Sequence, residues 1–184
     1  MNIVIRTASK VLVRVPIGER LRDFTPIAEA DSVLVKNLLN GKFIVRENVY
    51  FDIYDDFCMG WKIATICVPA GFETDFGSIP KIFRGIIEGI GTARDLIYLL
   101  HDWLYATEFF SWVGVAYVLR PAARDNRAAC DNLLLEGCKH VGDNWATRNT
   151  IWSQVRLWGW VTWNTHTLQS VTTNRALLTQ GGQA

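Results

Sequence analysis

The chain has 184 residues, which is the size of one domain and enough to bury a hydrophobic core without disulfide or metal staples. Hydrophobic residues make up 49% of it and charged residues 20%, a composition that excludes an intrinsically disordered protein. The chain has 19 basic and 18 acidic residues, so its formal net charge is +1. A charge this small creates no overall electrostatic field that would attract nucleic acid or an anionic membrane.

Strands are predicted in the first half, where short segments are rich in β-branched and aromatic residues. These segments are 11–15, 33–35, 43–45, 49–54 and 61–68. Residues 43–45 and 49–51 flank Arg46-Glu47-Asn48, which predicts a hairpin. The first half therefore reads as an antiparallel β meander.

Helices are predicted in the second half, after the loop TDFGSIP at 74–80. They cover about 82–88, the apolar run from Thr92 to 110, 123–140 and 143–163. Strands first and helices second predict an α+β fold, with an N-terminal antiparallel β meander followed by a C-terminal bundle of about four helices. We expect a single domain over residues 1–164 and a polar tail or arm over 165–184.

Cysteine spacing and the N-terminal sequence indicate a reducing compartment. Cys58, Cys67, Cys130 and Cys138 lack the spacing of a zinc site or a dense disulfide framework. The first residues, MNIVIRTASK, lack the long apolar run of a secretory signal, and no later run is long enough to span a bilayer. We expect a cytoplasmic chain without a membrane span.

Two ionisable residues, His101 and Asp102, lie inside the otherwise apolar second helix. Burial of an ionisable group costs free energy, so such a residue is expected to have a polar partner or a role in a functional site. Adjacent residues of a helix point about 100° apart, so the two side chains cannot aim at one point. Tyr98 and Tyr105 lie within one turn of both. The alternative to a functional site is a core His–Asp–Tyr hydrogen-bond cluster that fixes helix packing.

Two further carboxylates extend this candidate site. Asp131, on the third helix, is either an i,i+4 surface partner of Arg127 or a carboxylate that points inward at His101. Asp75 lies in the loop TDFGSIP, where capping of the following helix accounts for Ser78 better than for Asp75. We therefore expect a functional centre of Asp75, His101, Asp102 and Asp131.

Three motifs carry a resemblance to a known family. The segments VPAGFETDFGSIP, LLHDWLY and RAACD, in this order, resemble a domain-of-unknown-function family that is common in tailed phages and prophages. The likeness covers about residues 50–139 and implies a phage-encoded protein, made in the host cytoplasm and in some cases incorporated into the virion. It implies little about activity.

A weaker similarity concerns HDWLY alone. It is similar to the HDxCY helix of secreted phospholipases A2, in which the histidine activates water, the adjacent aspartate binds calcium and an aspartate of a second helix holds the histidine. The matching residues here are His101, Asp102 and Asp131. The cysteine framework and the glycine-rich calcium loop of those enzymes are missing.

Two functions are compatible with these residues. The first is a metal-dependent, envelope-directed hydrolase in which His101, Asp102 and Asp131 carry the catalysis and Asp75, His101 and Asp102 bind calcium, magnesium or zinc. Such a site needs a pocket that solvent reaches.

The alternative is a non-catalytic virion structural or assembly component of the tail, baseplate or head. In such a protein the same residues are buried away from solvent and hydrogen-bonded to one another. Five of the eight tryptophans lie between Trp145 and Trp163 and cannot share one helix face, which favours an interface. The expected partners are other phage structural proteins or further copies of the chain. We do not expect nucleic acid as a partner, because acidic residues dilute the basic cluster around Arg124.

Overall fold

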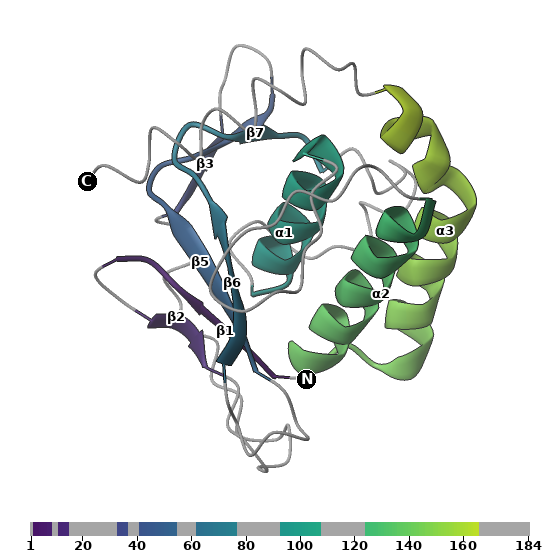
Figure 1. The fold of residues 1–184 in the computed structure, drawn as a ribbon, viewed down its shortest axis with the longest axis horizontal. Coiled ribbons are helices and arrows are strands. Elements are labelled where there is room, and N and C mark those ends of the chain that lie inside the picture. The colour runs from purple at the N-terminus through teal and green to yellow at the C-terminus, as the bar shows by residue number, and fades with distance from the viewer. Residues whose placement is uncertain are drawn as a thin grey trace.

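The protein is described here by a computed structural model, which covers residues 2–8, 11–14, 33–36, 41–54, 62–76, 93–107 and 124–165. Strands precede helices along the chain, so the fold is α+β (Figure 1). The strands are β1 (Asn2–Arg6), β2 (Val11–Arg14), β3 (Leu34–Lys36), β4 (Phe43–Val45), β5 (Val49–Tyr54), β6 (Lys62–Val68) and β7 (Glu73–Thr74). The helices are α1 (Ala93–Thr107), α2 (Arg124–His140) and α3 (Trp145–Thr165).

The strands form two antiparallel sheets, in the orders β2-β1-β5-β6 and β3-β4-β7. The expected hairpin between 43–45 and 49–51 is wrong, because β4 pairs with β3 and β7 whereas β5 pairs with β1 and β6. Its connecting residues bond to other segments instead: Arg46 N donates to Val33 O, and Asn48 Oδ1 accepts from Ala70 N. The β meander is therefore replaced by two sheets, and β1 and β7 are strands that the sequence analysis missed.

Side chains alternate across the four-stranded sheet, as the strand period requires. One face is apolar and buried; it includes Ile3, Ile5, Phe51 and Ile53. On the other face of β5, Asp52 accepts hydrogen bonds from Arg6, Lys62 and Thr65, and the Arg6 Nε–Asp52 Oδ2 distance is 2.6 Å. Burial opposes the ionisation of Asp52, but these donors leave its pKa below the ordinary value.

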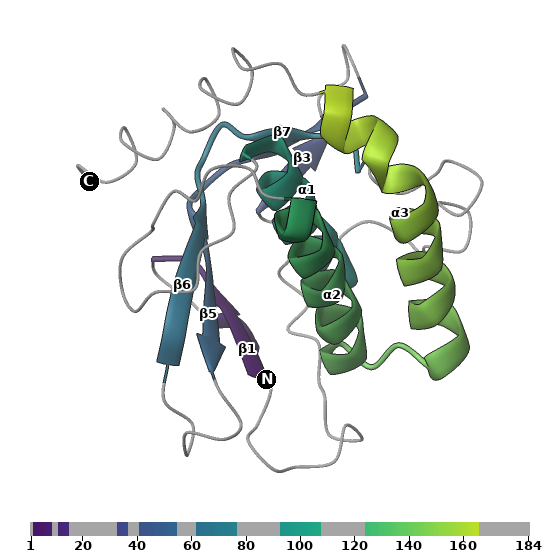
Figure 2. The ribbon, with the colours of Figure 1, turned by 45° about the vertical axis from the view of Figure 1, so that its right-hand side comes forward.

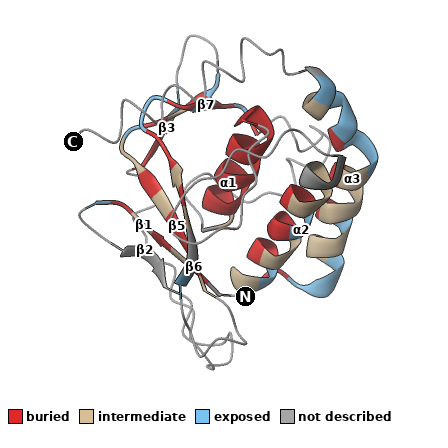
Figure 3. Ribbon diagram, viewed as in Figure 1, coloured by how far each residue is buried: buried red, intermediate tan, exposed pale blue. Residues whose placement is uncertain are grey.

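Helix α1 is the central element of the fold. It lies between the strands on one side and the antiparallel pair α2–α3 on the other (Figures 1 and 2). Because it is covered on both sides, every residue from Asp95 to Thr107 is buried, whereas α3 exposes its outer side (Figure 3). This layering explains why the α1 sequence is apolar nearly all round.

Three of the four expected helices are confirmed, with ends that differ from expectation by at most three residues. The count of about four helices is not supported, because the described part of the chain holds three and the expected helix at 82–88 lies outside it. The expected tail, beyond residue 165, also lies outside the described residues. No helix within the described ranges is long and apolar enough to cross a membrane.

Candidate functional site

His101 and Asp102 lie in the middle of α1 and face different neighbours. The His101 side chain turns toward α2, where its Nε2 is 3.2 Å from Asp131 Oδ1. The Asp102 side chain turns toward β7, where it accepts a hydrogen bond from Thr74 Oγ1. His101 is 1% exposed and Asp102 is 9% exposed. Helix geometry thus sends the two residues to opposite partners, as the 100° step predicts.

The Asp131 carboxylate is the centre of the larger cluster. It is fully buried and receives hydrogen bonds from three different helices. Tyr105 Oη donates to Oδ1 over 2.5 Å, beside His101. On the other oxygen, Oδ2, Arg156 Nη1 lies at 2.9 Å and Arg127 Nη1 at 3.5 Å. Asp131 therefore points inward at His101, and its i,i+4 contact with Arg127 is present as well.

The donors keep Asp131 ionised in spite of its burial. Burial alone would raise the pKa of this carboxyl, but the hydrogen bonds from His101 and Tyr105, and that from Arg156, bring it below the ordinary value. Burial, together with the nearby charge of Asp131, raises the pKa of Tyr105, so this phenol stays a donor. A buried carboxylate with two guanidinium partners is compensated in charge.

An ionised Asp131 also decides which nitrogen of His101 carries the proton. A carboxylate only accepts hydrogen bonds, so His101 Nε2 must donate to it. In the neutral imidazole the basic nitrogen is then Nδ1. The His101 ring also packs against Tyr105 at a centroid distance of 4.3 Å, which restrains its orientation.

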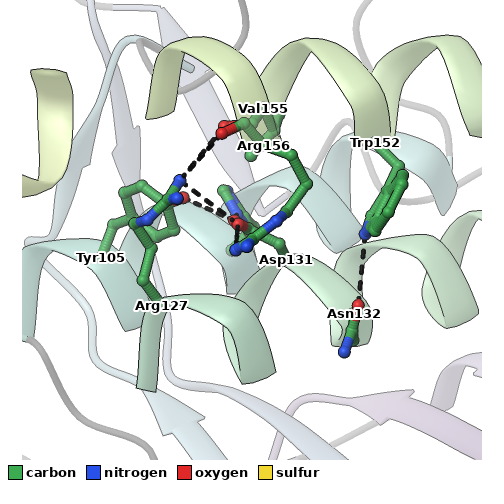
Figure 4. A network of polar contacts seen from close by, with 8 residues as sticks. Tyr105, Arg127, Asp131, Asn132, Trp152, Val155 and Arg156 are labelled. Carbon is green, nitrogen blue, oxygen red and sulfur yellow. Dashed lines mark hydrogen bonds and ion pairs between the residues drawn. The ribbon is translucent and has the colours of Figure 1, made fainter. Parts of the chain in front are cut away.

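Helix α3 contributes to this cluster in a way that the sequence analysis missed. Figure 4 shows Tyr105, Arg127 and Arg156 around Asp131, with the Trp152–Asn132 hydrogen bond beside them. The guanidinium of Arg127 also donates to the carbonyl oxygens of Val155 and Arg156, at 3.5 Å and 3.4 Å. No motif marks Arg156, and the only signal was a cation placed among the tryptophans of α3.

Thr74, the last residue of β7, holds the Asp102 side of α1. Thr74 Oγ1 donates to Asp102 and accepts the backbone N–H of Phe76 at 3.0 Å. Phe76 has a φ of 54°, in the left-handed region that non-glycine residues seldom occupy. The exposed Asp75 side chain lies between these two buried residues. Of the four expected site residues, the structure joins His101 to Asp131, whereas Asp102 bonds to Thr74 and Asp75 faces outward.

The surroundings of His101 are apolar and tight. A narrow crevice between α1 and α2 is lined by His101 and by apolar side chains, namely Ile97, Leu100, Leu104, Cys130, Leu133 and Leu134. A substrate reaches the ring only if neighbouring side chains move. Within the residues that the structure describes, no three His, Cys, Asp or Glu side chains form a group that could hold a metal ion.

Comparisons with known proteins give a family but no characterised relative. A family model with the description "Protein of unknown function (DUF1353)" matches residues 51–155, a range that runs from β5 to the middle of α3 and includes His101, Asp102 and Asp131. No significant match was found among curated proteins or among solved structures.

Proposed function

The chain belongs to the DUF1353 family of proteins of unknown function, and we propose that it is a phage-encoded protein with a hydrolase-like site in which His101 is the general base. The single observation that carries this proposal is the buried contact between His101 Nε2 and Asp131. Phage origin rests on the sequence resemblance and is part of the proposal.

The chemistry follows from the charge on Asp131. With Asp131 bonded to Nε2, His101 Nδ1 accepts a proton from a water molecule or a substrate hydroxyl group. Asp131 then stabilises the imidazolium that forms, and Tyr105 and Arg156 hold the carboxylate in place. Asp131 is a positioning residue in this scheme, since it touches His101 rather than the substrate. The resemblance to the HDxCY helix implies the same division of roles.

The metal ion is a separate part of the proposal. Asp75, His101 and Asp102 are the proposed ligands of a calcium, magnesium or zinc ion. Thr74, the neighbour of Asp75 in the chain, donates a hydrogen bond to Asp102 and so places this part of the chain beside α1, whereas the Asp75 side chain itself is exposed. The described side chains do not form a complete ligand set by themselves, so no step of the mechanism is assigned to the metal.

Hydrolysis of a substrate panel tests the proposal. Wild-type protein and His101→Gln are compared on chromogenic esters, anilides and phosphodiesters, each with and without calcium, magnesium or zinc. We expect turnover that falls by about 10²–10⁴-fold in His101→Gln, the usual contribution of a general base. A folded wild-type protein with no turnover on any substrate with any cation would refute the hydrolase function.

Two measurements on the protein alone separate the parts of the proposal. Nitrogen-15 NMR of His101 is expected to show the proton on Nε2, whatever the substrate is; a proton on Nδ1 alone would contradict the role of Asp131. Metal analysis by mass spectrometry is expected to show an ion that is lost in Asp102→Asn and in Asp75→Asn. Retention of that ion in both variants would reject these ligands.

A second candidate function is a non-catalytic structural or assembly component of the virion. It is favoured by the sealed state of His101 and Asp131, which suits a structural core, and by the exposed tryptophans of α3. Trp145, Trp158 and Trp160 are 71%, 60% and 54% exposed. On this view the partners are other structural proteins of the particle or further copies of the chain.

Proteomic analysis of purified phage particles tests this second function. A virion component is expected at a fixed copy number per particle, and loss of its gene is expected to leave incomplete particles. Absence of the chain from complete, infectious particles would remove a role as a virion component.

A further inference from the structure

The second half of α3 exposes large apolar side chains on the outside of the protein. Leu157, Trp158, Trp160 and Val161 are 63%, 60%, 54% and 43% exposed, and we call these four residues the α3 apolar face. Leu157, Trp160 and Val161 follow the i, i+3, i+4 spacing of one helix side, and Trp158 flanks them. Figure 3 shows exposed residues along this outer side of α3. A cluster of this kind is typical of an interaction site.

The exposure of these side chains is imposed by the opposite side of the helix. Ile151 and Val155 are buried on the inner side, and Gly159 continues their stripe against Tyr105. Trp163, a further turn along, packs edge-on against the ring of Tyr105 at 5.0 Å. Rotation of α3 that buried the apolar face would break all of these contacts, so the face cannot be withdrawn from solvent by turning the helix.

We propose that the α3 apolar face binds the same face of a second copy of this chain, with the two α3 helices related by a two-fold axis. A two-fold interface places each residue near the axis opposite its own copy, so any charge there meets the same charge. Residues 157–164, LWGWVTWN, contain no charged residue, although 20% of the chain is charged. Two copies of the face can therefore meet without placing like charges opposite each other.

The size of the face also suits a dimer. Two half-exposed tryptophans with a leucine and a valine offer on the order of 400 Å² of apolar surface, about half of the roughly 800 Å² that each partner contributes to a standard interface. An apolar centre with a polar rim is the usual arrangement, and Thr150, Gln154 and Asn164 provide polar side chains on α3 around it.

A lipid or nucleic-acid surface fits the face less well. Helices that bind anionic membranes or nucleic acids carry Lys and Arg beside their apolar residues. The nearest cation in sequence, Arg156, donates to the buried Asp131 and is part of the internal cluster. Arg156 and Gly159 lie on the same turns of α3 as the face. A dimer formed through the face would therefore also restrain the part of α3 that contacts Asp131 and Tyr105, whichever function the site has.

The molar mass in solution tests the dimer. Wild-type protein is studied by sedimentation equilibrium over a range of concentrations, beside Trp160→Glu and the control Trp145→Glu, which changes an exposed tryptophan outside the face. We expect twice the chain mass of 20.9 kDa for wild type and Trp145→Glu, and the single chain mass for Trp160→Glu. Matching far-ultraviolet circular dichroism spectra and a cooperative thermal transition in each variant would show that the outward substitutions leave folding intact, because loss of a dimer by itself lowers the melting temperature.

Other outcomes would overturn the proposal. A wild-type monomer at every concentration rejects the dimer. An oligomer that Trp160→Glu leaves unchanged places the interface on another surface. A monomer that co-sediments with phosphatidylcholine–phosphatidylglycerol vesicles, and loses this binding in Trp160→Glu, identifies a lipid surface as the occupant instead. None of these results depends on catalytic activity, so failure of the dimer is distinct from failure of the hydrolase.

Discussion

Gly159 of α3 faces the hydroxyl of Tyr105 on α1, and a β-carbon at position 159 would lie 2.6 Å from that oxygen. The same hydroxyl donates to Asp131, so this close contact between α3 and α1 lies beside the buried carboxylate. The absence of a side chain at 159 lets the helix come near enough for Arg156 to reach Asp131. Helix packing and the candidate site are therefore joined at this point.

The first prediction is that Gly159→Ala destabilises the protein. Alanine in a helix interior is ordinarily more stable than glycine by about 0.5–1 kcal/mol, so propensity alone predicts a gain. Steric overlap with Tyr105 is expected to reverse the sign and give a net loss of about 1–3 kcal/mol. Urea denaturation gives the free energy of unfolding. A gain of the size that propensity predicts would show that the two helices are further apart.

A double-mutant cycle identifies the oxygen responsible. Tyr105→Phe removes the hydroxyl that meets the new methyl group, so Gly159→Ala is expected to cost less in that background than in wild type. Strict additivity of the two substitutions would place the clash elsewhere.

The second prediction concerns the Tyr105 hydroxyl by itself. Tyr105→Phe removes a donor to an ionised carboxylate and is expected to lower the free energy of unfolding by about 1.5–3 kcal/mol. Tyr98→Phe is a matched control, because Tyr98 is equally buried at 1% exposed and its hydroxyl has no hydrogen-bond partner in the described structure. The control is expected to be neutral or stabilising. Equal losses in the two variants would contradict the role of the Asp131 bond.

The third prediction is a pH-dependent loss of stability in Asp131→Asn. At neutral pH the substitution leaves Arg127 and Arg156 beside an uncharged amide and is expected to cost on the order of 3 kcal/mol. The folded pKa of Asp131 is lowered, so its contribution is complete above the unfolded value of about 3.9 and is lost as the pH falls through the folded value.

Urea denaturation between pH 7 and pH 2 measures this effect. The difference between wild type and Asp131→Asn is expected to be constant above about pH 5 and to shrink below about pH 4. Glu73→Gln, which changes an exposed carboxylate outside the proposed site, is the control and is expected to stay within about 0.5 kcal/mol of wild type. A difference that grows on acidification would have the wrong sign for a lowered pKa.

The fourth prediction is that Thr74 needs its hydroxyl rather than its shape. Thr74→Val keeps the volume but removes the donor to Asp102 and the acceptor for Phe76 N–H, and it is expected to cost about 1–3 kcal/mol. Thr74→Ser keeps the hydroxyl and is expected to recover most of this loss. If valine were tolerated better than serine, packing would outweigh the hydrogen bonds at this position.

Local pattern was enough to predict the helices but not the pairing of the strands. Apolar runs and the residues that start and stop a helix are properties of neighbouring residues, so α1, α2 and α3 could be placed to within three residues. Strand pairing depends on distant partners: β1 pairs with β5 in a register that sets Arg6 opposite Tyr50. Residues 43–51 looked like a hairpin because nothing within them shows that β4 and β5 belong to different sheets.

The candidate site divides in the same way. The sequence by itself determined that His101 and Asp102 lie buried on one apolar helix, must face different ways, and need partners. Only the tertiary structure decided that Arg156 and Thr74 are among those partners, because the packing of α3 and β7 on α1 brings them there. Arg156 lies in no recognised motif, and the motif that contains Thr74 does not show which residue it meets. The inward side of a helix can be predicted from its own sequence, whereas the atoms that meet it depend on how separate elements pack together.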